Sequence, residues 1–280
     1  MSRHGSVPVR VGSRDRAAAA PRPGRINFDA VRAIWVRGVQ AEGRQNLWLA
    51  LAGFCEPIYY LVALGLGVGA LIGDTWSSGS RGPYLYYIAP GLLAVSVMNG
   101  ALYVCMNNAF LRIRYTGVYN ALLSGPVGSV ELVLGEVAVG VTRSGIYAAG
   151  FVAIGCGLSS FASVGGAVLS LPVCLIVGMA FGAVGLAIAF IVPSQQHLAM
   201  VRLAMLPLVL FSGAMYPISV LPEWLQMVIV SLPLWHGVEL LRAVLMLQFG
   251  GVWLHLVYFV VMALLGLWVA ERRVRARLLA

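Results

Sequence analysis

Three ionisable residues lie inside stretches that are otherwise apolar: Glu56, Glu136 and Arg143. Charged groups at the middle of a bilayer are costly, and they normally face a bundle interior or a water-filled cavity in pairs. Counted along their apolar stretches at about 1.5 Å per residue, Glu56 and Arg143 reach depths of roughly 14 and 17 Å. We therefore predict that these two side chains face each other or one polar pocket. Glu136, two turns below Arg143 on the same face, is expected to share that pairing.

Such a pair has two possible roles, and both stay open on the sequence. It fixes the packing of the helices as a structural ion pair, or it forms part of the polar lining of a solute path. A charge exchange that restores what each single substitution loses is the expected signature of pairing.

The other residue types exclude several chemistries. All nineteen cationic residues are arginine. A phosphate-binding GxxxxGK[ST] loop and a Schiff-base lysine are therefore impossible, and any ATP that drives this chain is bound by another chain. The cysteines are scattered without a CxxC pair, and no HxxxH or HExxH spacing occurs. We expect no catalytic residue, no metal and no cofactor on this chain, and we expect the histidines, His197, His236 and His255 among them, not to converge.

Composition places the chain in a membrane. The 280 residues are 60% hydrophobic and 10% charged, and the mean hydropathy is +0.88. Soluble domains carry about 25% charged residues. We predict an all-α polytopic membrane protein with six transmembrane helices, each near the ~20 apolar residues that a bilayer core needs. The spans are expected at about 47–72, 88–109, 132–154, 167–191, 198–215 and 253–269.

Arginine distribution predicts the orientation. With the N-terminus inside, the inner segments carry most of the arginines, and the outer segments hold only Arg81 and Arg242. This asymmetry favours two cytoplasmic termini in a multi-pass protein of the cell (inner or plasma) membrane. The net charge of +9 thus follows from cytoplasmic flanks, and nucleic acid is not an expected partner.

Two further segments precede and interrupt the spans. Residues 1–25 are rich in Arg, Pro, Gly and Ala and read as a disordered cytoplasmic tail, which leaves 26–280 as the membrane domain. From Asn27 to Arg44, Phe28, Val31, Trp35 and Val39 fall on one helical face, which is typical of an amphipathic helix on the inner membrane surface. Packing against a soluble partner is the alternative.

An apolar stretch before the last span is broken by three prolines, Pro217, Pro222 and Pro233. Its pieces are too short to cross a bilayer, so we predict a re-entrant hairpin of two short helices, about Glu223–Val230 and His236–Met246. Glu239 and Arg242 lie one turn apart and are able to pair. Gly178, Gly182 and Gly185 recur at a spacing that permits close contact between helices.

The loop Leu111–Ser129 is the strongest candidate for contact with a partner. Val118–Leu123 is long enough for a short helix ended by Gly125-Pro126, and Ser129 is placed to cap the next helix, with Glu131 in its first turn. Large aromatic side chains commonly dominate protein interfaces. An ordinary amphipathic loop with tyrosines at the lipid interface is the alternative.

A series of motifs resembles the permeases of type-2 ABC exporters. They are Glu56-Pro57, Ala89-Pro90-Gly91, Gly135-Glu136, and the series Phe211-Ser212-Gly213, Pro217, Leu221-Pro222, Leu232-Pro233 and Arg242. Their order is similar to that in the permease of rhizobial lipo-chitooligosaccharide export and, more loosely, to drug-resistance and polysaccharide-export permeases. The resemblance covers about residues 26–279.

The resemblance implies a six-span subunit that dimerises with a second permease copy and sits on a separate ATP-binding subunit, which holds ATP and Mg²⁺. It makes the loop Leu111–Ser129 the element that enters the ATPase, and the hairpin 217–246 an external gate, with an interfacial cap as the alternative. The coupling residues are then Tyr115, Val118, Tyr119, Asn120, Leu122 and Pro126. The gate residues are Pro217, Pro222, Pro233, Glu239 and Arg242.

The expected function is export of an amphiphile, such as a drug, a lipid or a lipid-linked saccharide. A membrane-embedded lipid or glycan transferase is the alternative, but it needs acids, bases or metal ligands that meet at one membrane surface. An ion-coupled secondary transporter usually shows internal repeats, and residues 47–154 and 167–270 do not match convincingly.

Overall fold

The computed structural model describes residues 26–45, 55, 57–69, 84–125 and 127–278. The predicted tail at 1–25, Glu56, Pro126 and much of the first predicted span lie outside this part. Every regular element in it is a helix. The elements are α1 (Phe28–Gln45), η1 (Ala63–Val68), α4 (Tyr84–Leu111), η3 (Arg112–Thr116), α5 (Val118–Leu123), α6 (Ser129–Gly157), α7 (Val164–Ile191), α8 (Gln195–Leu210), η4 (Ile218–Val220), α9 (Glu223–Val230), α10 (Pro233–Leu245) and α11 (Val252–Leu278).

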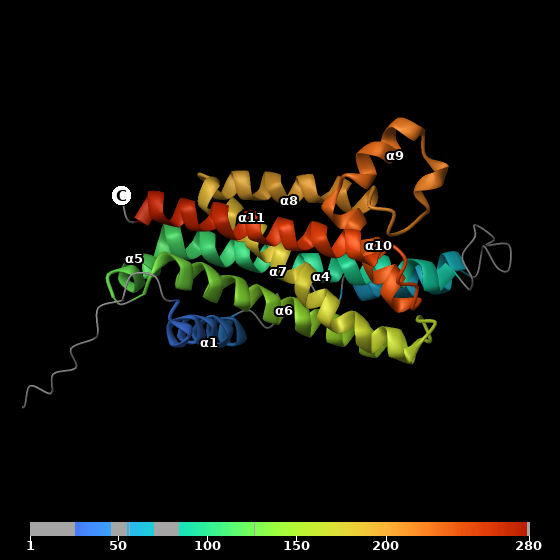
Figure 1. Ribbon diagram of the computed structural model, residues 1–280, viewed down its shortest axis with the longest axis horizontal. Helices are drawn as coiled ribbons and strands as arrows, with labels where there is room; N and C mark the ends of the chain where they lie inside the picture. Colours follow the sequence, from blue (N-terminus) through green and yellow to red (C-terminus); the bar gives the residue numbers. More distant parts are fainter. Residues whose placement is uncertain (1–25, 46–54, 56, 70–83, 126, 279–280) are drawn as a thin grey trace, which may run out of the picture.

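Four long helices, α4, α6, α7 and α11, form the body of the molecule and run along its long axis (Figure 1). α7 contacts the other three and also α10. α5 and the C-terminal end of α11 lie at one end of this bundle, whereas α9 and α10 lie toward the other (Figure 1). The loop before α6 and the hairpin before α11 are therefore separated by the length of the spans.

Small residues on α7 allow the close packing of this bundle. A Cβ atom at Gly185 would lie 2.5 Å from the Leu102 carbonyl oxygen and 3.1 Å from Leu102 Cα on α4. Gly178 and Gly182 likewise face Ser144 on α6 and Cys105 on α4. The predicted glycine stripe is thus confirmed as a contact surface, because only a missing side chain lets the two backbones approach so closely.

Four of the six predicted spans are confirmed as helices that are long and apolar enough to cross a membrane. They extend beyond the predicted limits, to Tyr84–Thr116, Ser129–Gly157, Val164–Ile191 and Val252–Leu278. A helix forms most of its backbone hydrogen bonds internally, as hydrocarbon requires, and α4 and α7 each tolerate one internal proline, Pro90 and Pro172. The first predicted span, 47–72, is described only at residues 55 and 57–69, where 57–62 are α-helical and Ala63–Val68 form a π-helix.

The fifth predicted span, 198–215, ends earlier than expected. α8 has 16 residues and stops at Leu210, after which residues 211–216 form turns and bends. A helix of that length is short for the ~30 Å hydrocarbon core. Among the described residues the structure supports four spans, or five if α9 and α10 form one span bent by 81°. Six spans stay a prediction.

The three prolines of the hairpin mark the starts of helices. Pro217 and Pro222 immediately precede η4 and α9, and Pro233 is the first residue of α10. Proline is tolerated there because the amide it lacks has no partner inside the helix. The two predicted short helices are confirmed, the second beginning at Pro233 rather than at His236. Entry of the hairpin into a membrane stays a prediction.

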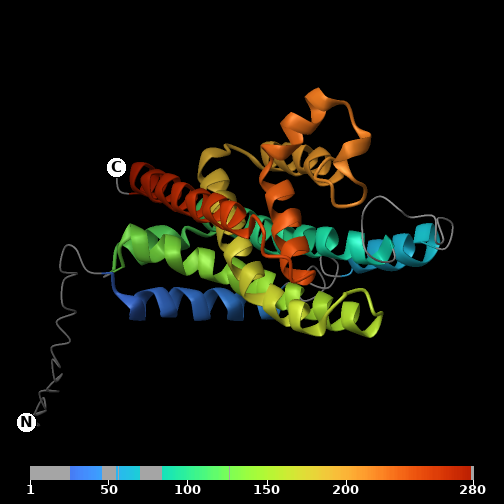
Figure 2. The same ribbon diagram turned by 45° about the vertical axis from the view of Figure 1, so that its right-hand side comes forward.

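α1 forms as a helix where the sequence predicts one, but its packed face differs. Ile34, only 4% exposed, and Gly38 lie against α6, whereas Phe28 is 75% exposed. The Trp35 Nε1–H group donates a hydrogen bond to Thr142 Oγ1 on α6 at 2.8 Å. α1 looks shorter in Figure 1 than in Figure 2, so it is inclined to the long axis of the bundle. Its position on a membrane surface stays a prediction.

Candidate functional site

The loop between α4 and α6 folds into a compact cap. η3 ends at Thr116, and Gly117 takes a positive φ of 61° that reverses the chain into α5. Glycine adopts this left-handed conformation without the steric cost that a side chain brings. The helix α5 then runs over Val118–Leu123, as predicted, and the Ser124 amide closes it on the Asn120 carbonyl at 3.0 Å.

Tyr119 does not lie on the surface of this cap. Its side chain is 1% exposed, and its ring stacks on Phe190 of α7 with 6.1 Å between centroids and 18° between planes. Burial raises the pKa of Tyr119 well above its ordinary value, so the hydroxyl stays neutral. The expectation that Tyr119 contacts a partner directly is wrong for this arrangement, because the ring faces inward and fastens α5 to α7.

The outer face of the cap carries the other predicted contacts. Tyr115 is 66% exposed, and its ring meets the Phe110 ring edge-on at 6.4 Å. Asn120 is also exposed, whereas Val118 and Leu122 are half-buried. The cap therefore exposes an aromatic ring on η3 and an amide on α5, and Val118 and Leu122 of α5 are partly accessible.

A buried ion pair joins the two helices that carry this cap. Arg112 of η3 contacts the Glu136 carboxylate of α6, whose side chain is 3% exposed. The expectation that Glu136 shares the pairing of Arg143 is wrong. The two residues lie on one face of α6, but seven positions separate them by about 10 Å along the axis. The cation that faces Glu136 at its position along the bundle is Arg112.

Ser129 does not cap α6 with its side chain, contrary to expectation. Gly128 is the N-cap residue, and Glu131 lies in the first turn as predicted. The Ser129 hydroxyl instead donates to the Glu271 carboxylate of α11 at 3.3 Å and accepts from Arg275 Nε at 3.2 Å. The start of α6 is thereby tied to the end of α11.

Arg242 is the centre of a second polar cluster, near the opposite end of the bundle. It pairs with Glu239, as predicted, and donates to the Gly213 carbonyl at 3.2 Å. Its guanidinium also lies 4.2 Å from the centroid of the Tyr87 ring on α4. The Tyr87 and Tyr84 hydroxyls donate to the carbonyls of Gly213 and Met215. We call this cluster, with residues 211–216, the outer clamp.

Close backbone packing completes the outer clamp. A Cβ atom at Gly91 would lie 2.6 Å from Cα and from the carbonyl oxygen of Ala214. Ala214 is fully buried. The Ala89-Pro90-Gly91 and Phe211-Ser212-Gly213 motifs are therefore two halves of one contact, although they are more than a hundred residues apart.

Arg143 is buried inside the bundle, as predicted. Its guanidinium donates to the Tyr147 hydroxyl at 3.3 Å and lies 5.8 Å from the centroid of that ring. Glu56 lies outside the described residues, so a Glu56–Arg143 pair stays a prediction.

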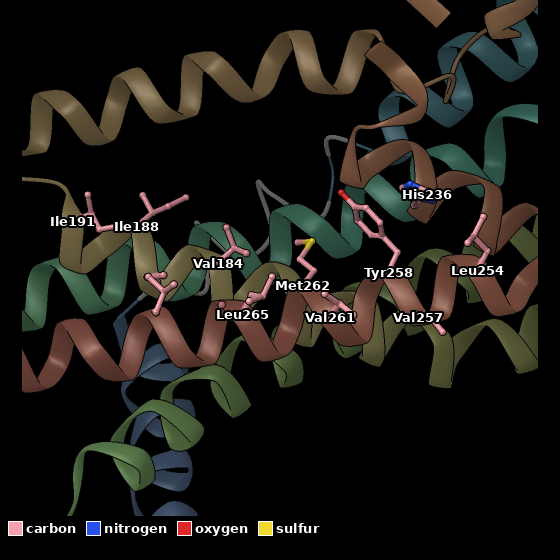
Figure 3. Close-up of a pocket in the computed structure, with 13 residues that line it drawn as sticks. Val184, Ile188, Ile191, His236, Leu254, Val257, Tyr258, Val261, Met262 and Leu265 are labelled. Carbon is pink, nitrogen blue, oxygen red and sulfur yellow. The ribbon is translucent and has the colours of Figure 1, made fainter. Parts of the chain in front are cut away.

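Two histidines do converge, contrary to expectation. The Nδ1 atoms of His236 and His255 lie 2.8 Å apart, so one donates and the other accepts. The His236 ring stacks on Tyr258 at 4.0 Å, and Figure 3 shows these two side chains meeting between α10 and α11. The spacing of the two histidines in the sequence did not reveal this pair, because it depends on α11 packing back against α10. The described residues contain no group of three His, Cys, Asp or Glu side chains able to hold a metal ion.

Long apolar helices, a short helical cap at one end and a proline-bounded hairpin toward the other define a multi-pass membrane protein. The chain belongs to the ABC-2 type transporter family, whose model matches residues 29–246. Members of this family are the membrane components of transporters, so the chain is a permease rather than a catalytic subunit.

The chain is also similar to several proteins named Nodulation protein J. It is 28% identical over 249 residues to that of Rhizobium leguminosarum bv. viciae, covering 86% of this chain and 93% of the relative. Identity is 30% over 237 residues with that of R. leguminosarum bv. trifolii, covering 84% and 86%. For the Sinorhizobium fredii protein it is 27% over 250 residues, covering 89% and 94%.

Proposed function

We propose that this chain is the permease subunit of an ATP-driven exporter that moves an amphiphile out of the cytoplasm. A separate ATP-binding subunit supplies the energy, and a second permease copy completes the pathway. The similarity to the ABC-2 family and to the nodulation proteins supports export by a permease. The observation that carries the coupling role is the cap formed by η3 and α5, which is fastened to the bundle through Arg112 and Tyr119 and exposes Tyr115 and Asn120.

Two contacts make α5 able to transmit a movement. The Tyr119–Phe190 stack links α5 to α7, and the Arg112–Glu136 pair links the end of α4 to α6. Packed side chains and ion pairs of this kind deform little, so a displacement of α5 is passed to three spans at once.

α4 extends this connection to the opposite end. Its 28 residues span about 42 Å at 1.5 Å per residue. Arg112 follows its last residue, whereas Tyr84, Tyr87 and Gly91 near its start hold the outer clamp. A movement at α5 therefore reaches residues 211–216 through one helix, which supports an outer gate in the hairpin.

Charge and aromatic positions support the proposed orientation. Arg112 and Arg114 lie at the end of the bundle that carries α5, and α11 ends in four arginines at that same end (Figure 1). Trp224, Trp235 and Trp253 belong to or border the hairpin. Basic inner flanks and an outer aromatic belt are the usual arrangement, so this distribution supports the proposal that both termini lie in the cytoplasm. An amphiphilic substrate suits spans with few buried charges.

The coupling role is tested on the exposed residues of the cap, Tyr115 of η3 and Asn120 of α5. A Tyr115→Ala, Asn120→Asp double variant should still accumulate as a folded membrane protein, because neither side chain is buried. It should lose capture of the ATP-binding subunit expected from a neighbouring reading frame, and it should lose export. An exposed change away from the cap, Trp253→Ala, is the control. Normal capture and export by the double variant would refute the assignment. Tyr119→Asp is unsuitable, since it would bury a carboxylate.

A further inference from the structure

An apolar groove of about 710 Å³ runs between α7 and α11. On α11 its lining follows one face at helical spacing, Leu254, Val257, Tyr258, Val261, Met262, Leu265, Gly266 and Val269. α7 contributes Val184, Ala187, Ile188 and Ile191, and His236 lies at the end near Leu254 (Figure 3). α8 contributes no side chain to this lining. The volume lies within the roughly 300–1,000 Å³ of pockets that hold one small ligand.

The groove opens to the outside of the bundle. In the most apolar 18-residue stretch of α11 only 17% is buried inside the protein, whereas 83% of the corresponding stretch of α4 is buried. In a membrane, side chains that face outward meet hydrocarbon. An apolar groove at that position is filled by acyl chains or by another helix.

A basic recess continues the groove at its Val269 end. Val269 lines both, and the recess is formed by Trp268, Glu271, Arg272, Arg273, Arg275 and Ala276. Arg272 and Arg273 follow Val269 by three and four positions, so they extend the groove stripe along the same face. Arg272 lies over the Trp268 ring at 4.0 Å.

The charge of this recess is not balanced locally. Glu271 is its acidic residue, and that carboxylate is engaged by Arg275 and by the Ser129 hydroxyl. Arg272 and Arg273 are exposed, and within the described residues neither forms an ion pair. A guanidinium presents a planar fork of donors that matches a phosphate group, so the recess is complementary to an anionic head group.

We propose that this groove and recess together form a binding site for one anionic phospholipid. The phosphate is held by Arg272 and Arg273, and an acyl chain lies along α11 from Val269 toward Met262. Half of the ~30 Å hydrocarbon core corresponds to about ten residues of helix, which is the distance from Arg272 to Met262. Basic pockets at the ends of spans bind lipid head groups by this chemistry.

The side chains of the groove favour a lipid over a second helix. Helix pairs in membranes associate through stripes of small residues that let backbones approach. Here the stripe consists of large side chains, apart from Gly266, whose face is already occupied by Ala183 of α7. The site requires only that α11 crosses a bilayer, and it does not depend on the proposed ATPase partner.

The test uses the full chain purified in mild detergent, with bound phospholipid measured by mass spectrometry and affinity by thermal shift with added phosphatidylglycerol or phosphatidylcholine. The wild-type chain should retain phosphatidylglycerol selectively. In Arg272→Gln, Arg273→Gln the affinity should fall about thirtyfold, as expected for two cations at an anionic lipid surface. Val261→Phe, Leu265→Phe should also lose the lipid by filling the groove.

Each variant has a matched control. The double variant Val260→Phe, Leu264→Phe adds the same side-chain volume at the two residues that precede Val261 and Leu265. These positions do not line the groove, so this variant should retain the lipid. Arg114→Gln, Arg277→Gln removes two exposed cations from the same end and should do the same. The site is refuted if the cation control loses as much lipid as the Arg272 and Arg273 variant, or if the Val261 and Leu265 variant keeps it. Equal stabilisation by inorganic phosphate, or disulfide cross-linking of two copies through cysteines at 261 and 265, would also overturn it.

Discussion

Arg112 and Glu136 place opposite charges where α4 and α6 meet, and most of each side chain is withdrawn from water. Removing one partner of such a pair leaves the other charge buried and uncompensated, which costs more than the intact pair contributes. The pair is therefore a point at which a single substitution should affect the whole inner end of the bundle.

We predict that Glu136→Gln lowers the free energy of unfolding by about 3 kcal/mol, because the Arg112 charge loses its counter-ion. Thermal unfolding of the purified chain in detergent measures the change. Replacing both residues together, Arg112→Met with Glu136→Leu, should cost less than the single change. A Glu271→Gln control, at a pair whose cation Arg275 is 62% exposed, should cost at most about 1 kcal/mol. A neutral effect of Glu136→Gln would show that the pair does not carry this role.

At the scale of elements, α4 is positioned at both of its ends by polar contacts and along its middle by the backbone contact with α7. The outer clamp is the more demanding end, since Gly91 has no room for a side chain against Ala214. α8 is different. Its described polar links run from Arg202 to Asn107 and to the Tyr103 ring of α4, and most of its apolar side chains are exposed.

We predict that Gly91→Ala separates residues 211–216 from the start of α4, because the added methyl group would overlap the Ala214 backbone at 2.6 Å. The backbone of Ala214 cannot yield as a flexible side chain would, so the cost should be in the range of about 1–3 kcal/mol for overpacking. Gly250→Ala is the control, because a Cβ there meets nothing within 4 Å. The measurement is the melting temperature of each variant. Equal melting temperatures would contradict the tight contact.

At the scale of the whole molecule, the charged residues that the structure describes are distributed unevenly along the bundle. Arg112, Arg114 and the four arginines of α11 lie at the end with α5 and the C-terminus, and the hairpin with its tryptophans lies toward the opposite end (Figure 1). This polarity predicts which end of each span faces the cytoplasm.

The natural cysteines provide a test of that orientation. Cys156 is exposed near the end of α6, whereas Cys105 and Cys174 are buried. In a Cys55→Ser background, a membrane-impermeant maleimide should label Cys156 in intact cells, and the additional change Cys156→Ser should abolish the signal. Labelling that appears only after permeabilisation would reverse the proposed topology.

Sequence reasoning succeeded where the cause is local. The length of the apolar stretches predicted the four long helices. Pro217, Pro222 and Pro233 predicted the breaks of the hairpin, because proline lacks the amide donor that would continue a preceding helix. The pairing of Glu239 with Arg242 was likewise predictable, since residues three apart share one face of a helix.

The remaining contacts depend on the rotation and depth of each helix relative to all the others. Glu136 pairs with Arg112, 24 residues away, and the Tyr87 hydroxyl reaches the Gly213 carbonyl, 126 residues away. Tyr119 has the residue type of an interface aromatic, yet the packing of α5 on α7 turns it inward. Apolar length and proline positions thus determined the class of protein and the presence of most of its described helices, although their limits differ by several residues. Only the tertiary structure decided which charges meet and which face of α5 is free, because these depend on how the packed spans share a limited volume.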